Sequence, residues 1–124
     1  HFTGQAALLV YLRRNSRKGV SGKLSLQIYI DGSFYSREDA KISVFDHTFL
    51  YGDGVFEGVR VYEGCIFRLQ QHLERLLDSA RYIMLEVPMD IHELTAAMVE
   101  TVRKNDIRNG SVLTYFQHDV LHQF

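Results

Sequence analysis

A short glycine-rich segment constrains this chain more than any other part of it. Gly52, Gly54 and Gly58 fall within seven residues, and residues 55–62 then alternate in character. Glycine permits tight turns and the close approach of another group to the backbone. A strand over this segment would divide its side chains between two faces, with Phe56, Gly58, Arg60 and Tyr62 on one and Val55, Glu57, Val59 and Val61 on the other.

The first of these faces has two interpretations. An aromatic ring, a gap at Gly58, a guanidinium and a phenol would line a site for a small anionic ligand. The same segment also fits one arm of a β-hairpin, because Glu63-Gly64 is a good turn before the apolar stretch that begins at Cys65. The pattern alone favours the hairpin arm.

Composition limits the classes of fold and partner. The chain has 124 residues, of which 46% are hydrophobic, so we expect one domain with one modest core. The longest apolar run, residues 6–12, is too short to span a bilayer. The single cysteine, Cys65, excludes an internal disulfide, fits a reducing, cytoplasmic setting, and is expected to be a buried core thiol. No metal site is expected, and a net charge of −1 gives no reason to expect nucleic acid.

Residues 1–26 differ in charge from the rest of the chain. They carry five basic residues and no acidic one. Such a leader resembles an organelle transit peptide in composition, but we favour a segment foreign to the domain, with a nucleic-acid-binding arm the least favoured interpretation. We therefore expect a basic leader over residues 1–26 and a domain over residues 27–124.

Several short strands are predicted in the domain. Residues 28–30 and 34–35 flank a tight turn at Asp31-Gly32-Ser33. Ile42 and Val44 suggest another strand, after which Asp46-His47 would begin a turn or cap a helix. Residues 111–124 begin as a predicted strand over residues 112–116, after which no regular pattern of apolar residues continues.

Two helices are predicted between these strands. Apolar side chains recur at three- and four-residue steps over residues 69–84. A second helix begins at the capping box formed by Asp90 and Glu93 and ends at the cations Arg103 and Lys104. The expected fold class is α+β, a small and mostly antiparallel sheet with two packed helices.

Arg75 is the most interesting cation of the first helix, because it lies beside the apolar stripe. A guanidinium suits a phosphate group, since its fork offers paired donors at matching geometry. The alternative is a surface salt bridge with Glu74, Asp78 or another neighbour, and the pattern alone favours it. His72 occupies a polar helical position and is expected to be exposed.

Residues 28–109 resemble the small N-terminal lobe of the class IV (fold type IV) pyridoxal-phosphate aminotransferases, with the branched-chain amino acid aminotransferases as the nearest match. The resemblance covers about two thirds of the chain, in order and without large gaps. It rests on five segments: residues 28–32, 40–47, 51–60, 67–69 and 72–80.

The resemblance implies a cofactor and a set of site residues. Arg75 matches the family's ligand for the phosphate of pyridoxal 5'-phosphate. Phe56, Gly58 and Arg60 match the strand that lines the substrate side-chain pocket, and Tyr51 matches a tyrosine lent across a homodimer interface. The implied activity transfers the amino group of Leu, Ile or Val to 2-oxoglutarate, as in branched-chain amino acid biosynthesis, in a homodimer or higher homo-oligomer. D-amino acid aminotransferases and aminodeoxychorismate lyases are the alternatives within the family.

Two departures qualify this expectation. The family's cofactor-binding lysine lies in a second, larger lobe that is absent here, and Lys41 and Lys104 occupy other positions, so no catalytic residue is assigned. We expect the chain to be inactive as this fragment. After Gly110 the family usually continues with Tyr-x-Arg, whereas this chain has Ser111-Val112-Leu113, and the match fades. A non-catalytic binding or dimerisation lobe is the alternative from a different class.

Overall fold

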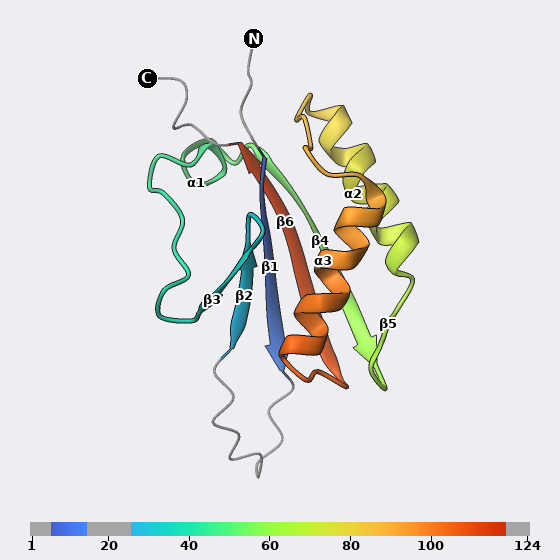
Figure 1. Cartoon of the computed structure of the whole chain (residues 1–124). Coiled ribbons are helices and arrows are strands. Elements are labelled where there is room, and N and C mark those ends of the chain that lie inside the picture. The colour runs from blue at the N-terminus through green and yellow to red at the C-terminus, as the bar shows by residue number, and fades with distance from the viewer. Residues whose placement is uncertain (1–5, 15–25, 119–124) are drawn as a thin grey trace.

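The structure, a computed structural model, describes residues 6–14 and 26–118 (Figure 1). These residues form one six-stranded sheet, with neighbouring strands antiparallel throughout, in the order β3-β2-β1-β6-β4-β5. The strands are β1 (Ala6–Arg14), β2 (Gln27–Ile30), β3 (Ser33–Ser36), β4 (Gly54–Tyr62), β5 (Cys65–Ile66) and β6 (Gly110–His118). The helices are α1 (His47–Tyr51), α2 (Leu69–Tyr82) and α3 (Ile91–Lys104). The predicted α+β class is confirmed.

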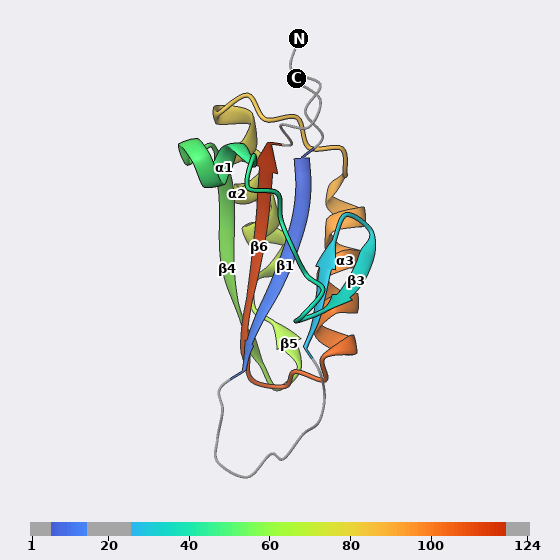
Figure 2. The same cartoon turned by 90° about the vertical axis from the view of Figure 1, so that its left-hand side faces the viewer.

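The two long helices cover one face of the sheet, as the views in Figures 1 and 2 agree. Leu73, Leu76 and Ala80 of α2 are buried there together with Leu94, Met98 and Val102 of α3. The sheet contributes Val55, Val59, Val61, Val112 and Phe116 to the same core. The alternation predicted for residues 55–62 is confirmed, because every second residue of β4 is buried and those between are exposed.

Strand β1 lies in the middle of the sheet, between β2 and β6. Its backbone pairs with β6 along its whole length, from Ala6 opposite His118 to Arg14 opposite Gly110. The sequence placed residues 1–26 in a leader outside the domain, but residues 6–14 belong to the same sheet as residues 27–118. The apolar run of β1 is strand-forming, and its partner is more than ninety residues away along the chain. Residues 1–5 and 15–25 of the predicted leader lie outside the described residues.

Local signals for turns and caps are confirmed. Asp31 and Gly32 take positive φ angles of 48° and 88° in the turn between β2 and β3, the backbone that a tight hairpin requires. The carboxylate of Asp90 accepts a hydrogen bond from the backbone N–H of Glu93 at 2.8 Å and caps α3.

Two sequence predictions are wrong. Residues 41–46 form no strand, and Val44 is 64% exposed. Cys65 is exposed on β5 rather than buried in the core, since β5 is a two-residue edge strand. Among the described residues, none of the helices has the length and apolar character needed to cross a bilayer.

Candidate functional site

The predicted ligand-facing side of β4 is the face turned away from α2 and α3. Phe56 is 69% exposed there, and Gly58 leaves open space, because a Cβ built on it would meet no atom within 4 Å. The neighbouring strand β6 extends this face. Three pairs of residues stand opposite each other across the two strands: Phe56 and Tyr115, Gly58 and Leu113, and Arg60 and Ser111.

Arg60 is held against this face by two neighbours. Its Nη1 donates a hydrogen bond to the Ser111 Oγ at 3.0 Å, and its guanidinium carbon lies 5.5 Å from the ring centroid of Tyr62. Sequence reasoning did not include Ser111 in the site. The alternation of residues 111–116 could have indicated that Ser111, Leu113 and Tyr115 share a face.

Tyr51 ends the short helix α1, which sits at one end of β4 and β6 (Figure 2). Tyr51 is 74% exposed. The Asp46 carboxylate caps this helix by accepting from the Phe49 N–H at 2.9 Å, as predicted, while the side chain of His47 is not among those described. The Thr48 Oγ1 donates to the Asp53 carbonyl at 2.9 Å, which fixes the chain between α1 and β4. Burial raises the pKa of the Tyr115 phenol beside this helix.

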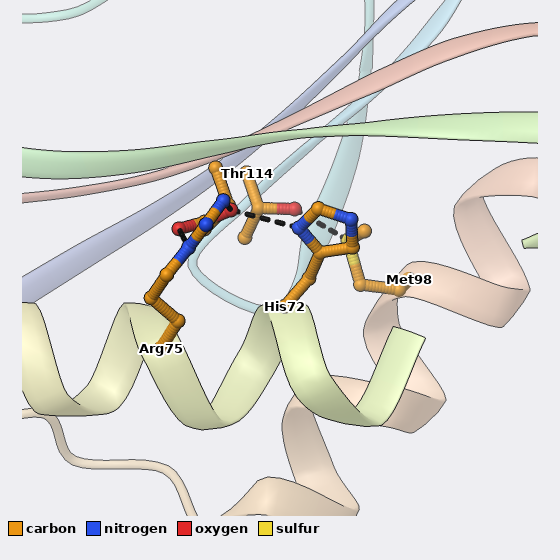
Figure 3. Close-up of polar contacts among 5 residues, drawn as sticks. His72, Arg75, Met98 and Thr114 are labelled. Carbon is orange, nitrogen blue, oxygen red and sulfur yellow. Dashed lines mark hydrogen bonds and ion pairs between the residues drawn. The ribbon is translucent and has the colours of Figure 1, made fainter. Parts of the chain in front are cut away.

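Arg75 projects from α2 and meets a carboxylate of β4. Its Nε and Nη2 donate to the Glu57 Oε1 and Oε2 at 2.6 and 2.7 Å (Figure 3). The arginine side chain remains 68% exposed. Glu57 is only 6% exposed and points toward the helices. The His72 side chain is only 21% exposed, so the prediction that it is exposed is wrong, and its Nδ1 lies 2.8 Å from the Glu57 Oε2.

The salt-bridge partner of Arg75 is therefore neither of its helical neighbours. Asp78 pairs with Arg81 at 3.0 Å, and Glu74 accepts from Gln70 at 3.1 Å. Sequence reasoning missed Glu57 as a partner of Arg75, because the contact joins a strand to a helix and no local sequence spacing predicts such a contact.

The charges of this cluster stabilise each other. The hydrogen bond from Arg75 holds the pKa of the Glu57 carboxyl below its usual value, although burial opposes this effect and the hydrogen bond with His72 adds to it. The same hydrogen bond raises the pKa of the Arg75 guanidinium. The pair therefore stays ionised at neutral pH. Among the described residues, no group of three or more His, Cys, Asp or Glu side chains is suited to hold a metal ion.

One edge of β4 is open along most of its length. Strand β5 pairs only with Val61 and Tyr62, and the Phe67 N–H donates to the Arg60 carbonyl at 2.8 Å. Along residues 54–59, β4 has no second strand partner among the described residues. Helix α2 lies over one face of β4, and Phe56 is exposed on the opposite face.

Comparison with known proteins gives a family match. The family model described as Amino-transferase class IV matches residues 54–118, which extends beyond residue 110, where the resemblance was expected to fade. A Methanocaldococcus jannaschii protein named as a branched-chain-amino-acid aminotransferase is 45% identical over 87 residues, 70% of this chain and 30% of that protein. An aminodeoxychorismate lyase of Bacillus subtilis is 42% identical over 84 residues, 68% of this chain and 29% of the lyase. A D-alanine aminotransferase of Staphylococcus epidermidis is 36% identical over 86 residues, 69% of this chain and 30% of that enzyme. The chain thus spans about 30% of the length of these relatives.

Solved structures of branched-chain aminotransferases resemble this chain in fold as well. The branched-chain amino acid aminotransferase of Escherichia coli superposes with a TM-score of 0.72 and 34% identity, over 77% of this chain and 34% of that one. The branched-chain aminotransferase of the thermophilic archaeon Thermoproteus uzoniensis, solved with norvaline, superposes with a TM-score of 0.65 and 33% identity, over 74% of this chain and 39% of that one.

Proposed function

Because this chain belongs to the class IV aminotransferase family, we propose that it forms the small lobe of a pyridoxal-phosphate-dependent branched-chain aminotransferase. The enzyme transfers the amino group of Leu, Ile or Val to 2-oxoglutarate. One observation carries the proposal: strand β4 holds the exposed cation Arg75 through Glu57 on one face and carries the open, Phe56-lined surface around Gly58 on the other. The identity to the Methanocaldococcus jannaschii protein supports the branched-chain type.

Arg75 is the proposed ligand for the cofactor phosphate. Its guanidinium is exposed, stays charged, and keeps N–H groups beyond the two that bind Glu57, so its donor chemistry fits a phosphate group. When bound, pyridoxal 5'-phosphate supplies the electron sink for chemistry at the substrate α-carbon. The chain's own contribution is to hold the phosphate and shape the substrate pocket. The lysine that carries the cofactor belongs to the second lobe in this proposal.

The proposed substrate pocket lies on the exposed face of β4. The ring of Phe56 and the gap at Gly58 face Tyr115 and Leu113 across the strands and form an apolar surface suited to an aliphatic side chain. Arg60 adds a cation held in place by Ser111. Tyr51, exposed at the end of α1, is proposed to complete the pocket of a second copy in a homodimer.

The alternative activities come from the same family. The Bacillus subtilis lyase and the Staphylococcus epidermidis D-alanine aminotransferase match nearly the same share of this chain. Assays of the protein encoded by the complete reading frame with L-leucine, D-alanine and aminodeoxychorismate distinguish the three activities. Faster turnover of either of the last two would replace the branched-chain assignment.

Two substitutions in that protein test the site. Arg75→Ala should weaken the affinity for pyridoxal 5'-phosphate by about 10- to 100-fold, the scale of a charge-assisted hydrogen bond. Phe56→Ala should leave cofactor affinity unchanged and reduce the discrimination among aliphatic substrates by about 1–3 kcal/mol, the scale of a lost apolar contact. Cofactor titration and kcat/KM for Leu, Val and Ala measure the two effects. Unchanged cofactor affinity and unchanged stability in the Arg75 variant would reduce Arg75 to a salt-bridge residue.

A further inference from the structure

The contact between Glu57 and Arg75 occupies one edge of the guanidinium. An arginine has two edges with paired, parallel N–H groups, a side edge made by Nε and Nη2 and an end edge made by Nη1 and Nη2. Glu57 binds the side edge, with its Oε1 2.6 Å from Nε and its Oε2 2.7 Å from Nη2. The end edge has no partner among the described residues. The ion pair therefore leaves one complete fork available.

The carboxylate that holds Arg75 is itself fixed. Glu57 is buried on the core face of β4, between Val55 and Val59. The His72 Nδ1 lies 2.8 Å from the same Oε2 that binds the Arg75 Nη2. Because a carboxylate oxygen only accepts, we assign the hydrogen to Nδ1 and His72 as a donor. His72 and Arg75 point from α2 toward β4 in Figure 3, so two residues of one helix hold the Glu57 carboxylate by hydrogen bonds.

We propose that Glu57 is a positioning residue, which fixes Arg75 so that its end edge is presented to the cofactor phosphate. This inference rests on the proposed function, in which Arg75 holds that phosphate. His72 supports the arrangement by donating to the Oε2 that also accepts from the Arg75 Nη2. Two hydrogen bonds to a buried carboxylate restrict the rotation of this otherwise exposed side chain.

Charge and geometry act in opposite directions here, which makes the inference testable. A carboxylate beside Arg75 lowers the positive potential that an anion meets, so by charge alone Glu57 would weaken phosphate binding. If positioning dominates, removal of Glu57 weakens phosphate binding instead. Glu57→Asp separates the two effects, because it keeps the charge and withdraws the carboxylate by one methylene.

The experiment compares dissociation constants for pyridoxal 5'-phosphate and for pyridoxal, which lacks the phosphate. It uses the protein encoded by the complete reading frame, as wild type, Glu57→Asp and Glu57→Gln. We expect both variants to lose about tenfold in affinity for pyridoxal 5'-phosphate and to bind pyridoxal as the wild type does. The ³¹P resonance of the bound phosphate should shift in both. Glu74→Gln, an exposed carboxylate one residue before Arg75, is the matched control and should change neither constant.

Three outcomes overturn the inference. Tighter binding of pyridoxal 5'-phosphate by Glu57→Gln, with Glu57→Asp unchanged, would mean that Glu57 acts only through its charge. Equal loss for both ligands would mean that it only supports the fold. Wild-type constants in both variants would mean that Arg75 needs no support. Arg75→Ala distinguishes failure of this inference from failure of the proposed function. If Arg75 does not hold the phosphate, the ratio of the dissociation constants for pyridoxal 5'-phosphate and pyridoxal stays unchanged in that variant. If only the role of Glu57 is wrong, that ratio still changes.

Discussion

Glu57 is a charged residue at a position where β4 otherwise buries valines. Burying a carboxylate costs free energy unless hydrogen bonds replace its water. Arg75 supplies two such bonds and His72 a third, and the arginine itself stays largely in solvent. The pair therefore avoids the larger penalty of burying both charges. A carboxylate in this position links the stability of the lobe to the orientation of the site arginine.

The ionisation of Glu57 makes part of this stability depend on pH. Its pKa is lowered in the folded state, chiefly by the hydrogen bond from Arg75, so its contribution is fully present above the unfolded value of about 4.5. That contribution is lost as the pH falls through the lower folded pKa. We expect Glu57→Gln to reduce the free energy of unfolding by about 1–3 kcal/mol at pH 7 and to flatten its decline below pH 4.5. Denaturant midpoints measured from pH 7 to pH 3 give both quantities.

Glu74→Gln serves as the control for the pH series, since Glu74 is an exposed carboxylate of the same helix that carries Arg75. If the free energy of unfolding fell in parallel for wild type and Glu57→Gln as the pH is lowered, Glu57 would have no role in the loss of stability in acid.

At the scale of elements, the sequence predicts what local periodicity controls. The two-residue period of β4 correctly placed Phe56 and Glu57 on opposite faces, and Asp90 correctly marked the start of α3. Local periodicity does not predict the pairing of strands that are distant in the sequence. Ile42 and Val44 have strand propensity but no partner strand. Residues 6–14 were assigned to a leader because residues 1–26 are basic and contain no acid, and that composition carries no information about their pairing with β6. The Glu57–Arg75 contact joins two elements whose packing no local pattern determines.

The two glycines of β4 should differ in their tolerance of a side chain. A Cβ on Gly54 would collide with the Thr48 side chain and lie 2.9 Å from the Phe116 carbonyl oxygen. We expect Gly54→Ala to destabilise the lobe by about 1–3 kcal/mol through overpacking between α1 and β6. Gly58→Ala is the matched substitution, because its Cβ would meet open space. Its thermal midpoint should stay near that of the wild type while the added methyl lowers kcat/KM for the bulkiest aliphatic substrates. Equal melting of the two variants would argue against the close packing of α1 on the sheet.

At the scale of the whole molecule, large apolar side chains are exposed on several elements. They include Phe45, Phe49, Leu50, Tyr51, Phe56, Tyr82 and Met84. Surface of this kind marks interfaces in soluble proteins. We expect the 124-residue chain, expressed by itself, to self-associate or to be poorly soluble. Sedimentation velocity over a range of concentrations measures this, and a monodisperse monomer at high concentration would favour a lobe that functions alone.

The chain's own lysines should not carry the cofactor. Covalent capture of pyridoxal 5'-phosphate needs a desolvated amine of lowered pKa. Lys41 lies in an exposed loop, and the Lys104 Nζ lies 4.6 Å from the centroid of the Phe34 ring at the end of α3. Neither is in the Glu57–Arg75 cluster, while Lys18 and Lys23 lie outside the described residues. We therefore expect incubation of the 124-residue chain with pyridoxal 5'-phosphate, followed by borohydride reduction, to leave only substoichiometric label spread over several lysines. Peptide mapping by mass spectrometry measures this distribution. Stoichiometric label on a single lysine, together with turnover of leucine, would overturn the placement of the cofactor lysine in a second lobe.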